Sequence, residues 1–181
     1  WGVLGTRLLP TGVEARAAEG PGRRIGIVDP AGLSHVRDKG PSGAKGASGA
    51  IYRFLGIHND LSFPLPVKTG IEAPTDAKAH DYGNGVTVVH VAGPDFNDRK
   101  MAVGGKKGAR VRLRRAYRNV LLEFLGLPLH GGLTHIRLLP VSGGIFSGAF
   151  AADMPRLTFD ALEDAYQTLT RDEKDYLSRF K

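Results

Sequence analysis

The sequence contains no cysteine among its 181 residues. Disulfide bonds and thiolate chemistry are therefore excluded, and a zinc site would need histidine and carboxylate ligands alone. The six histidines lack the close pairing that is typical of metal ligands, so we expect no metal site. Long apolar runs are lacking too. No stretch approaches the roughly 20 apolar residues that cross a bilayer, so we expect no membrane span.

Length and composition are those of a globular protein. Apolar residues make up 41% of the chain and charged residues 24%, and 181 residues favour a single domain with a substantial core. The chain begins at Trp1 rather than methionine, so we expect a processed product, a fragment or a trimmed chain. With no cysteine and no visible signal peptide, we expect an intracellular protein, and a mitochondrial one if a presequence has been removed.

The charge balance points to the kind of partner. Lysine and arginine number 25 against 18 acidic residues, which gives a net charge of +7, and the pI is about 9.9. Such a balance suits a polyanion such as RNA, or assembly into a larger particle. A basic, solvated surface without a partner is the simpler alternative, and charge alone does not choose between them.

Hydrophobic patterning predicts alternating strands and helices, and hence an α/β layered domain. We expect strands at 24–28, 85–91 and 134–139, and helices at 50–55, 109–125 and 157–169, followed by a short helix capped by Thr170 and Glu173. Residues 1–22 are expected to form an edge strand and loop that extend the N-terminus. Residues 59–85 are rich in proline, glycine and aspartate, and we expect a long loop with little regular structure there.

Two glycine-rich loops are candidates for phosphate binding. The strand at 134–139 runs directly into residues 140–150, where glycines allow close approach of a ligand and backbone N–H groups can converge on an anion. The loop at 38–49 opens the helix at 50–55, and the positive end of that helix suits an anion as well. An ordinary glycine and serine turn is the alternative for the loop at 140–150.

Arginines decorate the predicted helix at 109–125. Five of them lie off its apolar stripe: Arg110, Arg112, Arg114, Arg115 and Arg118. This face is either solvated or the contact surface for RNA or another subunit.

Several blocks of residues 24–170 resemble the macrodomains, a family that binds ADP-ribose and related nucleotides. Residues 28–32 read Val-Asp-Pro-Ala-Gly where the family has Val-Asn-Ala-Ala-Asn. Residues 43–52 resemble the glycine-rich loop Gly-Gly-Gly-Val-Asp-Gly-Ala-Ile-His, and residues 88–94 resemble Val-Ile-His-x-Val-Gly-Pro. Residues 140–148, Pro-Val-Ser-Gly-Gly-Ile-Phe-Ser-Gly, are similar to the distal phosphate loop. Segments 74–78 and 116–121 follow the family's order too.

The resemblance implies a three-layer α/β/α fold with a central mixed sheet and a ligand of the ADP-ribose type, with no other cofactor. It implies a ligand site at Asp29, Gly32, Gly46, Ala47, Ser48, Gly49, Ala50, Ser142, Gly143, Gly144, Ile145, Phe146, Ser147 and Gly148. The first loop would lie near the proximal phosphate and the second near the distal phosphate. Phe146 and Phe150 would pack either against ribose or base, or in the core. His90 is expected to be a hydrogen-bonded core histidine rather than a catalyst.

Three departures from the family bear on activity. Gly32 replaces the asparagine that contacts the distal ribose, and Ser48 replaces the aspartate that handles the attacking water in hydrolytic members. An uncharged serine cannot take up a proton as a carboxylate does. The aspartate that binds adenine has no clear counterpart, although Glu19 stands near the right spacing.

We therefore expect a module that binds ADP-ribose or a related nucleotide without hydrolysing it. The alternative is a structural or RNA-contacting component of a larger assembly that reuses the fold with a degenerate pocket. An active ADP-ribosyl hydrolase is the reading that these residues favour least.

Overall fold

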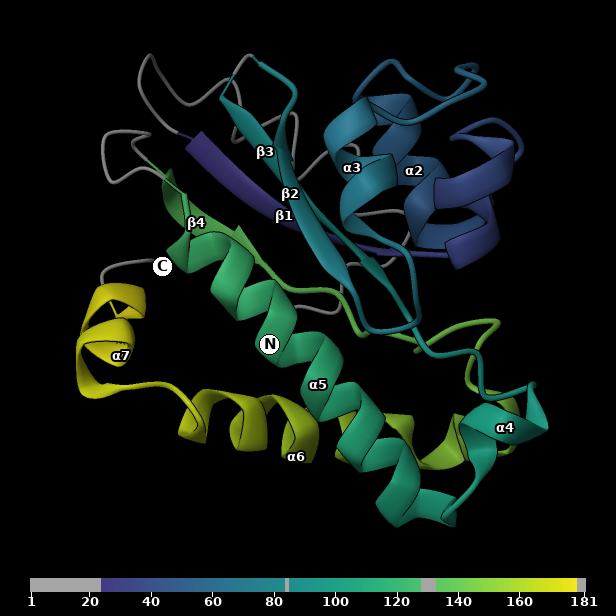
Figure 1. Cartoon of the computed structure of the whole chain (residues 1–181), viewed down its shortest axis with the longest axis vertical. Coiled ribbons are helices and arrows are strands. Elements are labelled where there is room, and N and C mark those ends of the chain that lie inside the picture. Colours follow the sequence, from purple (N-terminus) through teal and green to yellow (C-terminus); the bar gives the residue numbers. More distant parts are fainter. Residues whose placement is uncertain (1–23, 84, 128–132, 179–181) are drawn as a thin grey trace.

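The computed structural model describes residues 24–83, 85–127 and 133–178. A four-stranded sheet lies at its centre and is built from β1 (Arg24–Ala31), β2 (Ala77–Asp81), β3 (Val86–Ala92) and β4 (Leu133–Arg137), in the order β2-β3-β1-β4 (Figure 1). β1 pairs in parallel with both β3 and β4, whereas β2 runs antiparallel to β3. The sheet is therefore mixed.

Helices cover both faces of the sheet (Figure 1). One face carries a π-helical turn (His35–Lys39), α2 (Gly46–Phe54) and α3 (Leu65–Gly70). The other carries α5 (Gly105–Leu125) and α6 (Met154–Gln167), with the short α4 (Arg99–Ala102), a 3₁₀ segment (Gly148–Asp153) and α7 (Arg171–Leu177) beside them. The predicted three-layer α/β/α architecture with a central mixed sheet is confirmed.

Alternation along the two inner strands builds a core on each side of the sheet. Ile27 and Val88 pack in the cluster under α2 and α3, while their neighbours Val28 and Val89 pack in the cluster under α5 and α6. Successive strand side chains point to opposite faces, so a central strand with both faces covered is mostly apolar. β3 is accordingly buried along its whole length.

The helix predictions hold, with shifted ends. The apolar stripe of α5, from Leu113 to Phe124, is buried as expected, but the helix begins four residues before the predicted start at 109. α6 covers Met154–Gln167 rather than 157–169. Before α7 the predicted capping box is present: the Thr170 hydroxyl accepts from the Glu173 N–H, and the Glu173 carboxylate accepts from the Thr170 N–H.

The loop prediction for 59–85 was wrong in two places. α3 occupies Leu65–Gly70, where Pro66 stands in the first turn and its missing N–H costs no helical bond. β2 occupies Ala77–Asp81 and pairs with β3, which stabilises a strand whose own residues have weak strand propensity. The predicted extension at 1–22 lies outside the described residues.

Candidate functional site

The two glycine-rich loops meet around one pocket of about 340 Å³. It lies beside the carboxyl ends of the neighbouring parallel strands β1 and β4, between the first turn of α2 and the loop that follows β4. Ligand sites of α/β proteins commonly occupy this edge of the sheet. Nine of the fourteen predicted residues line the pocket: Gly32, Gly46, Ala47, Ser48, Ser142, Gly143, Gly144, Ile145 and Phe146.

One wall of the pocket is the N-terminus of α2. Lys45 is the extended residue before the helix, and its side chain does not cap the first turn. Because they stand in the first turn, the N–H groups of Gly46, Ala47 and Ser48 lack intrahelical acceptors. No acidic side chain stands in this turn either. Gly46 adopts φ +63°, and a Cβ there would meet no atom within 4 Å, so the pocket is open beside it. This wall offers backbone donors and the positive end of a helix dipole.

The opposite wall is the loop at 140–148, in which the carbonyl groups of Ile145 and Phe146 accept hydrogen bonds from outside the loop. Asn97 Nδ2 donates to the Ile145 carbonyl over 2.7 Å, and the Phe96 N–H donates to the Phe146 carbonyl over 2.9 Å. Within the described chain, the N–H groups of Gly144, Ile145 and Phe146 have no hydrogen-bond acceptor. A loop held by its carbonyls, with free N–H donors, suits an anion.

Ser142 shapes this wall rather than offering its hydroxyl. It is buried in the left-handed region with φ +58°, and its hydroxyl donates to the Pro94 carbonyl over 2.6 Å. Such a conformation is uncommon outside glycine. The bond to Pro94 ties the loop to the end of β3.

Gly32 packs directly beside the ring of Phe146. A Cβ on Gly32 would lie 3.2 Å from Phe146 Cζ and 3.7 Å from His35 Cδ2. A side chain at position 32 would therefore compete with the Phe146 ring for the same space.

Asp29 does not line the pocket but lies fully buried beneath it. Its carboxylate accepts hydrogen bonds from Ser48 Oγ at 2.6 Å, Tyr52 OH at 2.7 Å and His90 Nδ1 at 2.8 Å. Burial, and then the charge of Asp29, raise the pKa of Tyr52 well above its ordinary value, so the phenol stays a neutral donor. The predicted ligand role of Asp29 is replaced by a structural one, because its carboxylate is already engaged by three donors.

His90 is a hydrogen-bonded core residue, as predicted. It is fully buried, with Nδ1 on Asp29 and Nε2 hydrogen-bonded to Tyr82 OH at 2.8 Å. Burial raises the pKa of Tyr82 above its ordinary value as well. A chain of hydrogen bonds thus runs from Ser48, at the pocket, through Asp29 and His90 to Tyr82.

Four further predicted residues lie behind the walls: Gly49, Ala50, Ser147 and Gly148. The two glycines are needed for close backbone approach. A Cβ on Gly49 would lie 2.4 Å from the Ala44 carbonyl oxygen, and one on Gly148 would lie 2.4 Å from that of Phe96. Phe150 is buried and packs edge-on against Phe96 with ring centroids 5.2 Å apart, so its core interpretation is confirmed.

Sequence reasoning did not single out His35, Lys45 and Tyr52 as pocket residues. All three line the pocket. The His35 ring is fixed by a hydrogen bond from Nδ1 to the Gly40 carbonyl at 3.0 Å. Lys45 stands directly before Gly46 in the glycine-rich loop, and that position was the only local signal for it.

The described residues contain no cluster of three histidine or acidic side chains that could hold a metal ion. Within the same ranges, the helices fall short of the length and apolarity needed to cross a membrane. Comparisons of the sequence with protein-family models and with curated proteins gave no match.

Proposed function

We propose that this chain is a divergent macrodomain-like module that binds ADP-ribose, or a related nucleoside diphosphate, without hydrolysing it. One observation carries the proposal. Two glycine-rich segments far apart in the sequence, at 43–49 and 140–148, face each other across a single pocket with unpaired backbone N–H groups on both walls. Two anionic groups in series, as in a diphosphate, match two facing sets of donors.

The pocket also has a neighbour suited to the rest of a nucleotide. A hollow of about 470 Å³ shares Leu139, Pro140 and Gly143 with the pocket, and α6 contributes Phe159, whose surface is about half exposed. Its lining is mainly apolar, and apolar walls with a few polar groups are typical of ligand sites. In this proposal the diphosphate lies in the first pocket and the aromatic base in the second.

Hydrolysis is disfavoured by the groups that face the pocket. Its described lining includes no aspartate or glutamate. Ser48, which stands in the place of the family's aspartate, donates its hydroxyl proton to Asp29. Both oxygens of Asp29 already accept hydrogen bonds. Neither Ser48 nor Asp29 is therefore placed to act as a carboxylate base on a water at this position.

The test is calorimetric titration of the purified chain with ADP-ribose, beside a Gly144→Glu variant. Gly144 lies outside the left-handed region, and a Cβ there would meet nothing within 4 Å. The Gly144→Glu variant should therefore fold normally, and its glutamate side chain should place bulk and negative charge in the pocket. We expect micromolar binding by the parent chain and at least a tenfold loss in the variant.

Gly126→Glu is the matched control, because it makes the same chemical change at an exposed glycine with φ −75° at the far end of α5. It should bind like the parent chain. A folded parent chain that does not bind ADP-ribose, or a Gly144→Glu variant that binds unchanged, would contradict the proposal. Release of ADP-ribose from a modified protein would contradict its non-hydrolytic part.

The second candidate, a structural or RNA-contacting component of an assembly, keeps one observation in its favour. The family's ribose-binding asparagine and its aspartate are both replaced, by Gly32 and Ser48. Failure of nucleotide binding by a well-folded chain would favour that alternative.

A further inference from the structure

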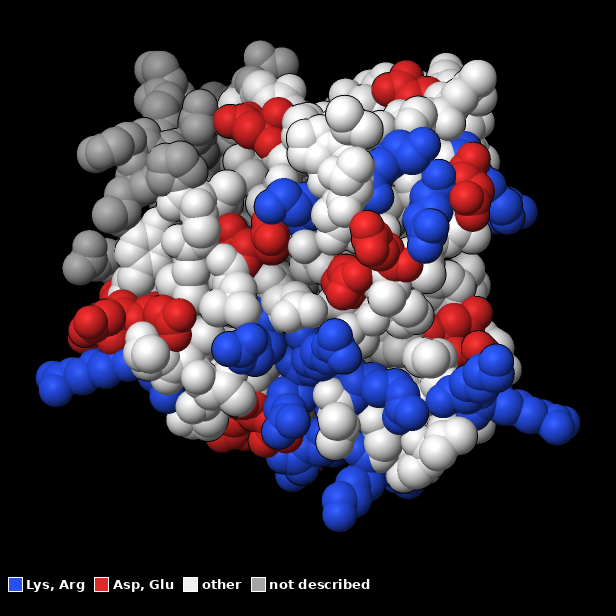
Figure 2. Space-filling model, viewed as in Figure 1, with Lys and Arg blue, Asp and Glu red and all other residues white. Residues whose placement is uncertain are grey.

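Positive charge is concentrated along α5. From Gly105 to Leu122 this helix carries seven cations and no acidic residue: Lys106, Lys107, Arg110, Arg112, Arg114, Arg115 and Arg118. Figure 2 shows lysine and arginine side chains gathered over α5 and α4 on one face of the molecule.

Two of the seven are used inside the fold. Arg110 makes a two-pronged contact with Asp164 of α6, with Nε and Nη2 at 2.6 and 2.7 Å from its carboxylate oxygens. Lys106 Nζ lies 2.8 Å from Asp153 Oδ1. The hydrogen bond from Arg110 lowers the pKa of Asp164 below its ordinary value, so this pair is charged at neutral pH. These contacts hold α5 against α6 and against the segment that precedes α6.

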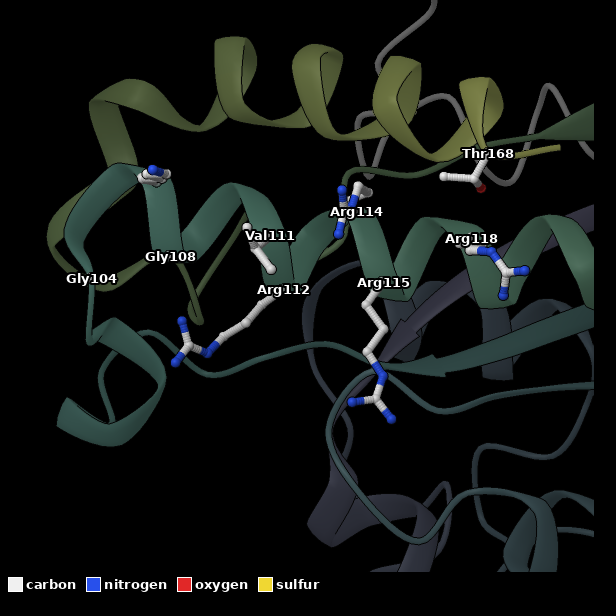
Figure 3. Close-up of a pocket in the computed structure, with 9 residues that line it drawn as sticks. Gly104, Gly108, Val111, Arg112, Arg114, Arg115, Arg118 and Thr168 are labelled. Carbon is white, nitrogen blue, oxygen red and sulfur yellow. The ribbon is translucent and has the colours of Figure 1, made fainter.

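The remaining five line a hollow of about 750 Å³ together with Gly104, Gly108, Val111 and Thr168. In Figure 3, Arg112 and Arg115 extend from α5 on the side away from α6. Among the described residues, no carboxylate forms an ion pair with any of the five. Arg112 donates to the carbonyls of Val103 and Lys100 at 3.0 and 3.3 Å, which orients its guanidinium without neutralising it.

This arrangement is unfavourable for the isolated helix. Arg114 and Arg118 stand four residues apart, and Arg115 and Arg118 stand three apart, so like charges lie next to each other on the helix surface. Lys106 and Lys107 stand in the first turn, beside the positive end of the helix dipole, where acidic residues are absent. Arg114 is partly compensated, since its charge helps to lower the pKa of Asp164. The charge of the other four cations that line the hollow has no carboxylate partner among the described residues, which indicates a function that lies outside the fold.

We propose that this hollow binds the phosphodiester backbone of single-stranded RNA without base specificity. From Lys107 to Arg118 the helix rises about 16 Å, which is long enough to lie along several phosphates of one strand. Four of the five cations are arginines, whose planar forks suit phosphate oxygens. The residues that line the hollow include no aromatic side chain on which a base could stack. The site is separate from the nucleotide pocket and shares no lining residue with it.

The test is fluorescence anisotropy of a labelled, mixed-sequence RNA of about 15 nucleotides, titrated between roughly 50 and 200 mM salt. The variant that removes two cations from this hollow, called the groove variant, is Arg115→Ala/Arg118→Ala. Each phosphate contact on a single strand adds about 0.7 to the slope of log affinity against log salt. Loss of two contacts should therefore lower the slope by about 1.4 and weaken binding at 0.1 M salt on the order of 20-fold.

The matched control is Arg37→Ala/Arg53→Ala, which removes two exposed arginines near the opposite face of the sheet. It should bind RNA like the parent chain, and so should Gly144→Glu. The groove variant should also unfold at the same or a higher temperature, because alanine favours helix and relieves repulsion.

Three results would overturn the proposal. They are no salt-dependent RNA binding by the parent chain, equal loss of affinity in the groove and control variants, and equal competition by a polyglutamate peptide of the same charge. The last result would assign the hollow to an acidic protein partner instead.

Discussion

Asp29 illustrates how one residue holds the region beneath the pocket together. Its buried carboxylate is the shared acceptor for side chains from α2 and β3. Burial of a charge is costly unless it is paired and hydrogen-bonded, and here each donor arrives from a different turn or strand. The network fixes Ser48 and Tyr52, both of which line the pocket.

We expect Asp29→Ala to lower the free energy of unfolding by about 3–5 kcal/mol, because each buried donor left without its acceptor costs about 1–3 kcal/mol. His90 and Tyr52 would then be left buried without their acceptor. Ser48→Ala, which removes one part-buried donor, should cost about 1 kcal/mol. Urea unfolding of both variants measures the difference, and equal losses would contradict the central role of Asp29.

The loop at 140–148 shows at the level of an element how glycines divide their roles. Gly148 has φ +50° and leaves no room for a Cβ beside the Phe96 carbonyl. Gly144 has an ordinary φ and faces open space. The first glycine positions the loop, and the second leaves the pocket open.

Two alanine substitutions separate these roles. Gly148→Ala should lose about 1–3 kcal/mol from the left-handed conformation alone, with the clash in addition. Gly144→Ala should change stability by less than about 1 kcal/mol, and toward greater stability. Thermal unfolding of the two proteins compares them directly, and a large loss in Gly144→Ala would show that this wall is packed rather than open.

Local signals explain which elements were predicted from sequence. The α5 stripe, the α7 capping box and the glycine-rich loops are each readable within about a dozen residues, and each is present. β2 was missed because its own residues, Ala-Lys-Ala-His-Asp, have weak strand propensity, so the strand depends on the elements beside it. It pairs with β3, and its Ala79 N–H donates to the Glu123 carboxylate of α5 over 2.8 Å.

The same distinction applies to the candidate site. Glycines mark both pocket loops locally, so most of the two walls was predicted. The ring of Phe146 beside Gly32 and the burial of Asp29 result from packing between β1, α2 and the loop after β4. No spacing in the sequence encodes these contacts.

At the scale of the whole molecule, the burial of tyrosines makes the stability of the fold sensitive to alkaline pH. Burial raises the pKa values of Tyr52, Tyr82 and Tyr117 above the ordinary value of 10.0. Each phenol keeps its proton in the folded state at a pH where the unfolded chain releases it. Their stabilisation is therefore complete below pH 10 and is lost as pH rises toward the raised values.

We expect the free energy of unfolding to fall above pH 10, by about 1.4 kcal/mol per pH unit for each buried tyrosine. Urea unfolding across this range measures the slope, and ultraviolet absorbance of tyrosinate reports ionisation. Tyr117→Phe should make the slope shallower. Tyrosinate absorbance from these residues in a chain that is still fully folded at pH 10 would contradict the prediction.

The central claim is that one pocket, formed by two distant glycine-rich loops, binds a nucleoside diphosphate. The most direct measurement is the amide spectrum of ¹⁵N-labelled protein during titration with ADP-ribose. The largest shifts should come from the N–H groups of both walls: Gly46, Ala47, Gly144, Ile145 and Phe146. Unchanged resonances for these residues at saturating ADP-ribose, or shifts confined to α5, would contradict the claim.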